Sequence, residues 1–177
     1  MANRRAGRVS EIDTAGAGLA LQKLVGLQLA EISSIVDVRS FGFRSQVEQH
    51  SANNELSYAL DLHCAWRIEA GETLMTGRAD FFERATDNRD ETWQPGDVWG
   101  NVQDEMLTEL LGLYDRGRRV VINSGLGLVV TSVLIDPFGG FQMDLSHGLR
   151  LAVFPDGGRD EKWSLLSLTT DYRFVLV

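Results

Sequence analysis

The chain has 177 residues, of which 44% are hydrophobic and 24% charged, with a formal net charge of −8 and an isoelectric point near 4.8. This length and composition are typical of one ordinary globular domain and argue against wholesale disorder. The negative charge argues against general binding to nucleic acid or to anionic membranes, because such binding depends on clustered cations.

Two features of the sequence indicate a cytoplasmic protein. Cys64 is the single cysteine, so the chain forms no intrachain disulfide and needs no oxidising compartment. Residues 19–30 are interrupted by polar residues and glycine, which excludes a signal core or a membrane span there. We expect a flexible tail over residues 1–15 and a single domain over residues 16–177.

Two helices are expected. Residues 16–25 follow the capping-type residues Asp13 and Thr14 and carry apolar residues at helical spacing. A second apolar stripe starts at residue 97 or 101 and runs to residue 111, with acidic residues in its early turns. The two helix ends share an apolar and glycine pattern, which suggests a helix-plus-strands pseudo-repeat: Leu24-Val25-Gly26-Leu27 and Leu110-Leu111-Gly112-Leu113.

Residues 58–68 alternate large apolar side chains with small or polar ones, which predicts one strand with one buried face. That face would contain six residues: Tyr58, Leu60, Leu62, Cys64, Trp66 and Ile68. Residues 69–72 are a turn signal and residues 73–82 alternate again, so the two segments should form a β-hairpin. In the predicted register Ile68 lies opposite Thr73, and Trp66 lies opposite Met75.

The remaining strand-like segments also alternate with turn signals. They are residues 27–33 and 36–44, residues 119–122 and 127–134 on either side of a turn at 123–125, residues 141–145 and 149–154, and residues 163–167 and 172–176. The sequence therefore predicts an α+β fold, a mainly antiparallel sheet built from hairpins with two helices packed on it.

The polar face of the predicted hairpin carries the residues best suited to acid–base or metal chemistry. The register places His63 opposite Arg78 and Asp61 opposite Asp80, with Arg67 nearby. Histidine titrates near neutrality and a carboxylate can orient it. The alternative is a solvated sheet face with opposite charges paired across strands, each pair contributing at most about 1 kcal/mol.

The negative charge is concentrated between residues 83 and 118, which contain nine acidic residues against four arginines. Residues 83–96 form a long polar stretch, which is expected to be a linker, a domain boundary or a mobile loop. Four of its residues are candidates for binding a protein partner, which could be basic: Asp87, Asp90, Glu91 and Trp93. The alternatives are that the acidic residues serve solubility and that Trp93 pins the loop to its own core.

No cofactor is expected, because the sequence has neither a dinucleotide fingerprint nor a phosphate-binding loop nor a nucleophile elbow. Three histidines and one cysteine without paired ligand spacing argue against a zinc site. Adjacent strand residues point to opposite faces, so Cys64 and His63 cannot form a catalytic pair.

Three motifs together resemble small uncharacterised bacterial proteins, some of which are similar to immunity proteins that neutralise a toxin by binding it. The motifs are His63-Cys64-Ala65-Trp66-Arg67-Ile68, Gly148-Leu149-Arg150-Leu151-Ala152-Val153-Phe154-Pro155 and Glu161-Lys162-Trp163-Ser164-Leu165-Leu166. The likeness covers residue 58 to the end of the chain, except for residues 83–96, which have no counterpart in it. It implies a binding role. Its motifs are core patterns without a catalytic signature, so no functional residue is carried over from it.

Two functional hypotheses remain. The leading one is a non-enzymatic, immunity-like binding protein that engages a protein partner through its acidic segment or a sheet face. The alternative is a small-molecule binder or hydrolase centred on Asp61, His63 and Arg78. A homodimer through a sheet edge is compatible with both.

Overall fold

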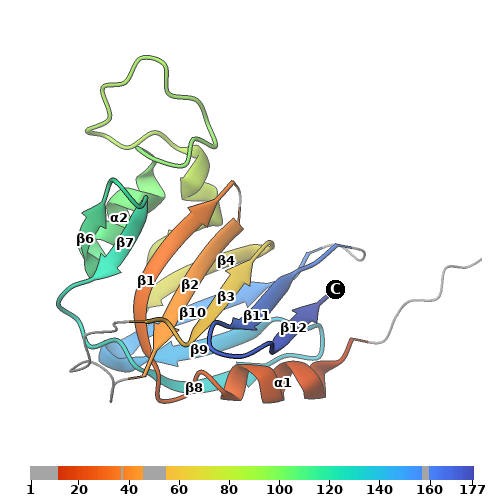
Figure 1. Cartoon of the computed structure of the whole chain (residues 1–177). Helices are drawn as coiled ribbons and strands as arrows, with labels where there is room; N and C mark the ends of the chain where they lie inside the picture. The colour runs from red at the N-terminus through yellow and green to blue at the C-terminus, as the bar shows by residue number, and fades with distance from the viewer. Residues whose placement is uncertain (1–11, 37, 46–54, 157–159) are drawn as a thin grey trace, which may run out of the picture.

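The computed structural model describes residues 12–36, 38–45, 55–156 and 160–177. Two antiparallel sheets, of seven and five strands, lie face to face (Figure 1). The predicted α+β class with mainly antiparallel sheet is confirmed. Most of the expected N-terminal tail, residues 1–11, and most of the polar segment after the second predicted strand, residues 46–54, lie outside the described residues.

The seven-stranded sheet has the strand order β12-β11-β3-β2-β1-β7-β6. Its strands are β1 (Gln28–Ile35), β2 (Val38–Arg44), β3 (Tyr58–Leu62), β6 (Gly112–Asp115), β7 (Val120–Asn123), β11 (Trp163–Ser167) and β12 (Arg173–Leu176). The predicted hairpins β1–β2 and β11–β12 both form, and β3 lies between them, paired with β2 and β11. A further hairpin, β6–β7, was not predicted and extends the sheet beyond β1.

The five-stranded sheet has the order β5-β4-β10-β9-β8. Its strands are β4 (Ala65–Ala70), β5 (Thr73–Gly77), β8 (Val130–Ile135), β9 (Phe141–Leu145) and β10 (Leu149–Phe154). The predicted pairs β4–β5 and β9–β10 form. The two strands expected to pair around the turn at 123–125 lie in different sheets. At this turn the Asn123 amide donates to the carbonyl of Leu29 and its side-chain oxygen accepts from the backbone N–H of Leu126.

The expected single strand over residues 58–68 is two strands. The chain leaves the seven-stranded sheet after β3, bends at His63 and Cys64, and enters the five-stranded sheet as β4. The predicted burial is nevertheless correct for five of the six residues, which are 4% exposed or less: Leu60, Leu62, Cys64, Trp66 and Ile68. The apolar face stays directed inward because both sheets face the same core.

The predicted register of the β4–β5 hairpin is wrong. The turn contains two residues, so Ala70 rather than Ile68 pairs with Thr73, and an irregularity after Ile68 shifts the register again. Trp66 consequently lies opposite a residue of β10 and not opposite Met75. Alternation of residue types does not reveal where a strand inserts an extra residue.

The two helices are close to their predicted positions. Helix α1 (Thr14–Gln22) starts two residues early, with the Asp13 carboxylate accepting a 2.8 Å hydrogen bond from the backbone N–H of Gly16, and it packs against β8 and β12 (Figure 1). Helix α2 (Val102–Leu111) packs against β6, β7 and the short 3₁₀ helix η2 (Arg78–Phe82). A second 3₁₀ turn, η3 (Ser146–Gly148), connects β9 to β10. None of the helices in the described part of the chain is long and apolar enough to cross a bilayer.

Each helix is followed by a glycine with positive φ and by a hairpin of the seven-stranded sheet. Gly26 has φ of 86° and Gly112 has φ of 104°, a conformation that favours glycine over residues with a side chain. Helix, glycine and strands thus follow one another twice along the chain, in the order that the predicted pseudo-repeat has.

The core lies between the sheets and contains residues of both. Phe41 of β2 meets Trp66 of β4 edge to face at 5.4 Å between ring centroids, and Phe141 of β9 meets Trp163 of β11 at 5.5 Å. The indole N–H of Trp163, fully buried, donates a 2.8 Å hydrogen bond to the carbonyl of Gly139. Cross-sheet aromatic contacts of this kind make the two sheets one packing unit.

Candidate binding groove

The five residues predicted for acid–base or metal chemistry lie in different parts of the structure. Asp61 pairs in register with Ser40 and Ser164 of its neighbouring strands in the seven-stranded sheet. The Nε2 atom of His63 lies 3.5 Å from the carboxylate of Glu161, with a third of the histidine side chain exposed. His63 is therefore opposite neither Arg78, which lies in η2, nor any residue of β5.

The other three lie on or beside the five-stranded sheet. Arg67 forms an ion pair with Glu69 on its own strand. The Asp80 carboxylate accepts a 2.8 Å hydrogen bond from the hydroxyl of Thr76 and another of 2.8 Å from the backbone N–H of Gly77. Arg78 lines a small internal pocket. The predicted strand over residues 73–82 ends at Gly77 and is followed by η2, and the predicted hairpin register does not form, so the five residues are not brought together. Within the described residues no group of three or more ligand-type side chains is placed to hold a metal ion.

The two ends of the polar segment after η2 are joined to each other by backbone hydrogen bonds. The backbone N–H of Val102 donates to the carbonyl of Glu83, and that of Ala85 donates to the carbonyl of Gly100, each at 2.9 Å. Between these anchors the chain extends beyond the ends of the strands (Figure 1). We call residues 83–101 the loop segment.

Local hydrogen bonds shape the loop segment from within. The Asp90 carboxylate accepts from the backbone N–H and the hydroxyl of Thr92, at 2.8 and 2.7 Å, and these bonds lower the pKa of Asp90. The guanidinium of Arg84 donates to the carbonyls of Asn88 and Asp90. Side chains that bind nearby backbone groups favour turns over helix or sheet.

The four residues predicted to bind a partner have different environments. Trp93 is only 9% exposed and its indole N–H donates a 2.9 Å hydrogen bond to the carbonyl of Trp99, so it packs inside the loop segment. Asp87 and Glu91 are exposed, and Asp90 is half-buried. The exposed tryptophan is Trp99, which is 40% exposed and which the sequence reasoning did not select.

A groove of about 800 Å³ lies between the loop segment on one side and α2 with the β6–β7 turn on the other. We call it the loop groove. It is open to solvent and is lined by side chains of both charges together with two aromatic residues. The lining residues are Ala85, Asp87, Asn88, Arg89, Trp99, Gly100, Asn101, Asp104, Glu105, Thr108, Glu109, Tyr114, Arg116 and Arg119.

The charges of the loop groove are largely unpaired. Arg89, Arg116 and Arg119 are exposed, and none of the three forms an ion pair with a described residue. Acidic side chains from α2, Glu105 and Glu109, line the same space. A ligand with groups of both signs would find a partner for each of them here.

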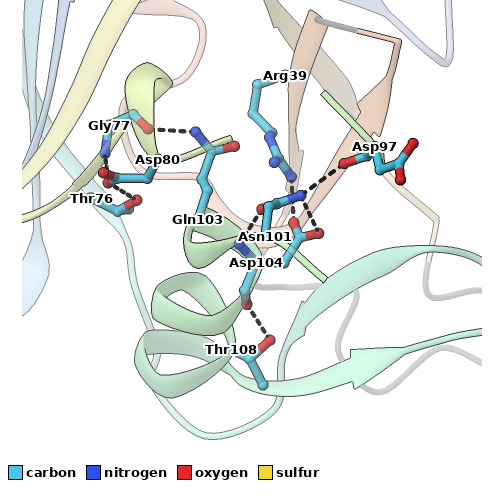
Figure 2. Close-up of polar contacts among 9 residues, drawn as sticks. All are labelled: Arg39, Thr76, Gly77, Asp80, Asp97, Asn101, Gln103, Asp104 and Thr108. Atoms are coloured by element: carbon cyan, nitrogen blue, oxygen red, sulfur yellow. Dashed lines mark hydrogen bonds and ion pairs between the residues drawn. The ribbon is translucent and has the colours of Figure 1, made fainter. Parts of the chain in front are cut away.

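A buried ion pair supports the floor of the loop groove. The Arg39 Nη1 atom lies 3.0 Å from Asp104 Oδ1, and the two side chains are 5% and 8% exposed (Figure 2). The Asn101 amide donates to Asp104 Oδ2 at 3.1 Å, and its oxygen caps α2 by accepting from the Asp104 backbone N–H at 2.9 Å. Burial raises the pKa of Asp104, and the adjacent Arg39 acts in the opposite direction.

The sequence does contain a signal for this ion pair. Arg39 has the same strand parity as Phe41 and Phe43, so it faces the core beside two buried aromatic residues. An arginine in that position requires a buried acceptor. Which acidic residue supplies it depends on how α2 packs against β2, and that is not readable from a local pattern.

The fold and groove define an α+β protein with two facing antiparallel sheets and an open, charged groove beside its second helix. Comparisons with protein-family models, with curated proteins and with solved structures found no match.

Proposed function

We propose that this chain is a binding protein that holds an extended segment of a protein partner in the loop groove. The observation that carries the proposal is the exposed Trp99 in a groove whose three arginines have no ion-pair partner among the described residues. Tryptophan and arginine are enriched among residues that contribute most to binding at protein interfaces.

The shape and charge of the groove favour a polypeptide over a small molecule. A site for a small ligand is usually concave and mostly apolar with a few polar groups, whereas this groove is open and carries charges of both signs. An extended segment with both acidic and basic side chains would pair with the arginines and with Glu105 and Glu109. This extends the expectation of a basic partner to a partner of mixed charge.

The resemblance in sequence gives the proposal a specific form, an immunity-type role in which the partner is a toxin. Such a role requires a stable scaffold and a contact surface that differs between relatives. The resemblance is lost at residues 83–96, which belong to the loop segment, and the loop segment forms one wall of the groove. We also propose a cytoplasmic location, because the single buried thiol needs no oxidising compartment.

Site-specific photo-crosslinking in the native host tests the proposal. A photoreactive amino acid at Trp99 should capture a partner protein, identified by mass spectrometry, and the same amino acid at Phe138, exposed on the turn between β8 and β9, should not. Capture of one protein equally from both positions would contradict the groove as the contact site.

A partner identified in this way permits a direct measurement of affinity. Replacing Arg116→Glu should weaken binding by at least about tenfold, since a charge-reversed groove residue would repel a carboxylate of the partner. Arg173→Glu, a similar exchange on β12, is the control and should leave binding unchanged. Equal affinities for the two variants would exclude the arginines of the groove from recognition.

A further inference from the structure

A second, much smaller pocket lies on the other side of the Arg39–Asp104 ion pair. Its volume is about 10 Å³, and it is enclosed by the end of the β1–β2 hairpin, by β4, by η2 and by α2. Trp66 and Phe81 supply its apolar walls, and the guanidinium of Arg39 lies over the ring of Phe81 at 5.4 Å from the centroid.

Three residues that line this pocket each carry a buried polar atom with no hydrogen-bond partner among the described residues: Ser34 Oγ, Arg39 Nη2 and Gln103 Oε1. They come from β1, β2 and α2, and Ser34 and Arg39 are cross-strand neighbours in the β1–β2 hairpin. Arg39 is 4% exposed and Gln103 is 1% exposed. Buried polar atoms without a partner are rare, and three around one cavity indicate a shared ligand.

We infer that one internal water molecule occupies this pocket and joins the β1–β2 hairpin to α2. The volume corresponds to about one water molecule, and internal waters typically make about three hydrogen bonds to groups that would otherwise be unpaired. The water accepts from Arg39 Nη2, donates to Gln103 Oε1 and exchanges a hydrogen bond with the Ser34 hydroxyl.

The chemistry of the three atoms selects water over other small ligands. A halide ion would face the carbonyl oxygen of Gln103, whose amide nitrogen already donates to the carbonyl of Gly77 (Figure 2). A cation would face the Arg39 guanidinium. An apolar ligand would leave all three polar atoms unpaired.

The inferred water has a structural role beside the loop groove. Arg39 donates through Nη1 to Asp104 and has Nη2 free for the water, so the two contacts fix the plane of the guanidinium. Asp104 lines the loop groove. The hairpin end is thereby connected to the floor of the groove through one water and one ion pair.

Water relaxation dispersion, which counts long-lived internal waters in solution, tests the inference with two matched variants. Ser34→Val fills the pocket with methyl groups and removes one hydrogen-bond partner, so it should lose one long-lived water relative to the wild type. Ser33→Val makes the same exchange at the neighbouring position, which does not line the pocket, and should keep it. An equal number of long-lived waters in wild type and Ser34→Val would overturn the inference.

Crystallography provides a readout that does not depend on the stability of the variants. A high-resolution crystal structure of the wild type should show a spherical density peak within hydrogen-bonding distance of Ser34 Oγ, Arg39 Nη2 and Gln103 Oε1. An empty pocket would overturn the inference. An anomalous peak there after a bromide soak would do the same, since it would assign the pocket to an anion.

Discussion

At the scale of single residues, the most informative feature is the buried ion pair between Arg39 and Asp104. Both side chains are removed from water, which costs more than an exposed pair would, and the cost is offset by hydrogen bonds from Arg39 and Asn101. The pair is the point where β2, α2 and the loop groove meet.

We expect that removing one member of this pair destabilises the protein far more than replacing both. Asp104→Ala leaves the Arg39 guanidinium buried without a counter-charge and should lower the free energy of unfolding by about 3–5 kcal/mol. The double variant Arg39→Met with Asp104→Leu should recover most of that loss. Urea denaturation measures both, and a loss below about 1 kcal/mol for the single variant would contradict the structural role.

Cys64 predicts how stability depends on alkaline pH. Burial raises the pKa of its thiol from 9.0 to about 11. The unfolded chain therefore releases this proton at lower pH than the folded one. The resulting contribution to stability is complete below about pH 9 and is lost as the pH rises through 11, a change of about 2–3 kcal/mol.

The matched measurement compares the wild type with Cys64→Ala between pH 8 and pH 11, within the range in which both remain folded. As the pH rises, the unfolding free energy of the wild type should fall relative to that of the variant, which has no thiol to titrate. Burial also raises the pKa of Tyr114 and Tyr172, and their effect cancels in this comparison. A pH-independent difference would show that the thiol does not titrate differently in the two states.

At the scale of elements, local signals were sufficient for the helices and for most hairpins. Asp13 and Gly112 mark the start of α1 and the end of α2, because a cap acts within one turn of the chain. The division of residues 58–68 between two sheets was not predictable, since both halves keep the same buried face. The candidate site on the opposite face depended on one long hairpin, but Asp61 lies in the other sheet and Arg78 and Asp80 lie in η2, so the site does not form.

The glycine at the end of α2 leads to a prediction about helix termination. Gly112 has φ of 104°, and a Cβ atom there would lie 2.5 Å from Ser124 Oγ. Gly112→Ala should therefore lower the unfolding free energy by about 1–2 kcal/mol from the backbone conformation alone, with the contact adding to it. Gly125→Ala is the control, because a Cβ at that position meets no atom within 4 Å. Thermal denaturation measures both variants, and equal unfolding midpoints for the two would refute the role of Gly112.

At the scale of the whole molecule, the two sheets share one core, and the chain passes directly from one sheet into the other between β3 and β4. The core cluster contains residues of both sheets, and β3 passes directly into β4 at His63 and Cys64. Neither sheet can expose its inner face without exposing the other. The loop groove is likewise formed by separate parts of the chain, since its lining residues come from the loop segment, from α2 and from the β6–β7 hairpin.

We expect both sheets to unfold together. In native-state hydrogen exchange, the slowest amides of β3 and of β10 should report the same opening free energy, equal to that of global unfolding. Amides of the loop segment should exchange through smaller openings, since much of its backbone bonding is local. Distinct opening free energies for the two sheets would contradict a shared core.

The anchoring of the loop segment has a consequence for how this scaffold can change. Because the two ends of the loop segment meet at its base, the chain between Ala85 and Gly100 can be exchanged for one of different length while Asn101 still caps α2. Each doubling of loop length adds only about 0.6 kcal/mol of closure entropy. One wall of the groove is thus open to replacement by evolution or by grafting, and a chain of this architecture could acquire a different specificity while every core residue stays the same.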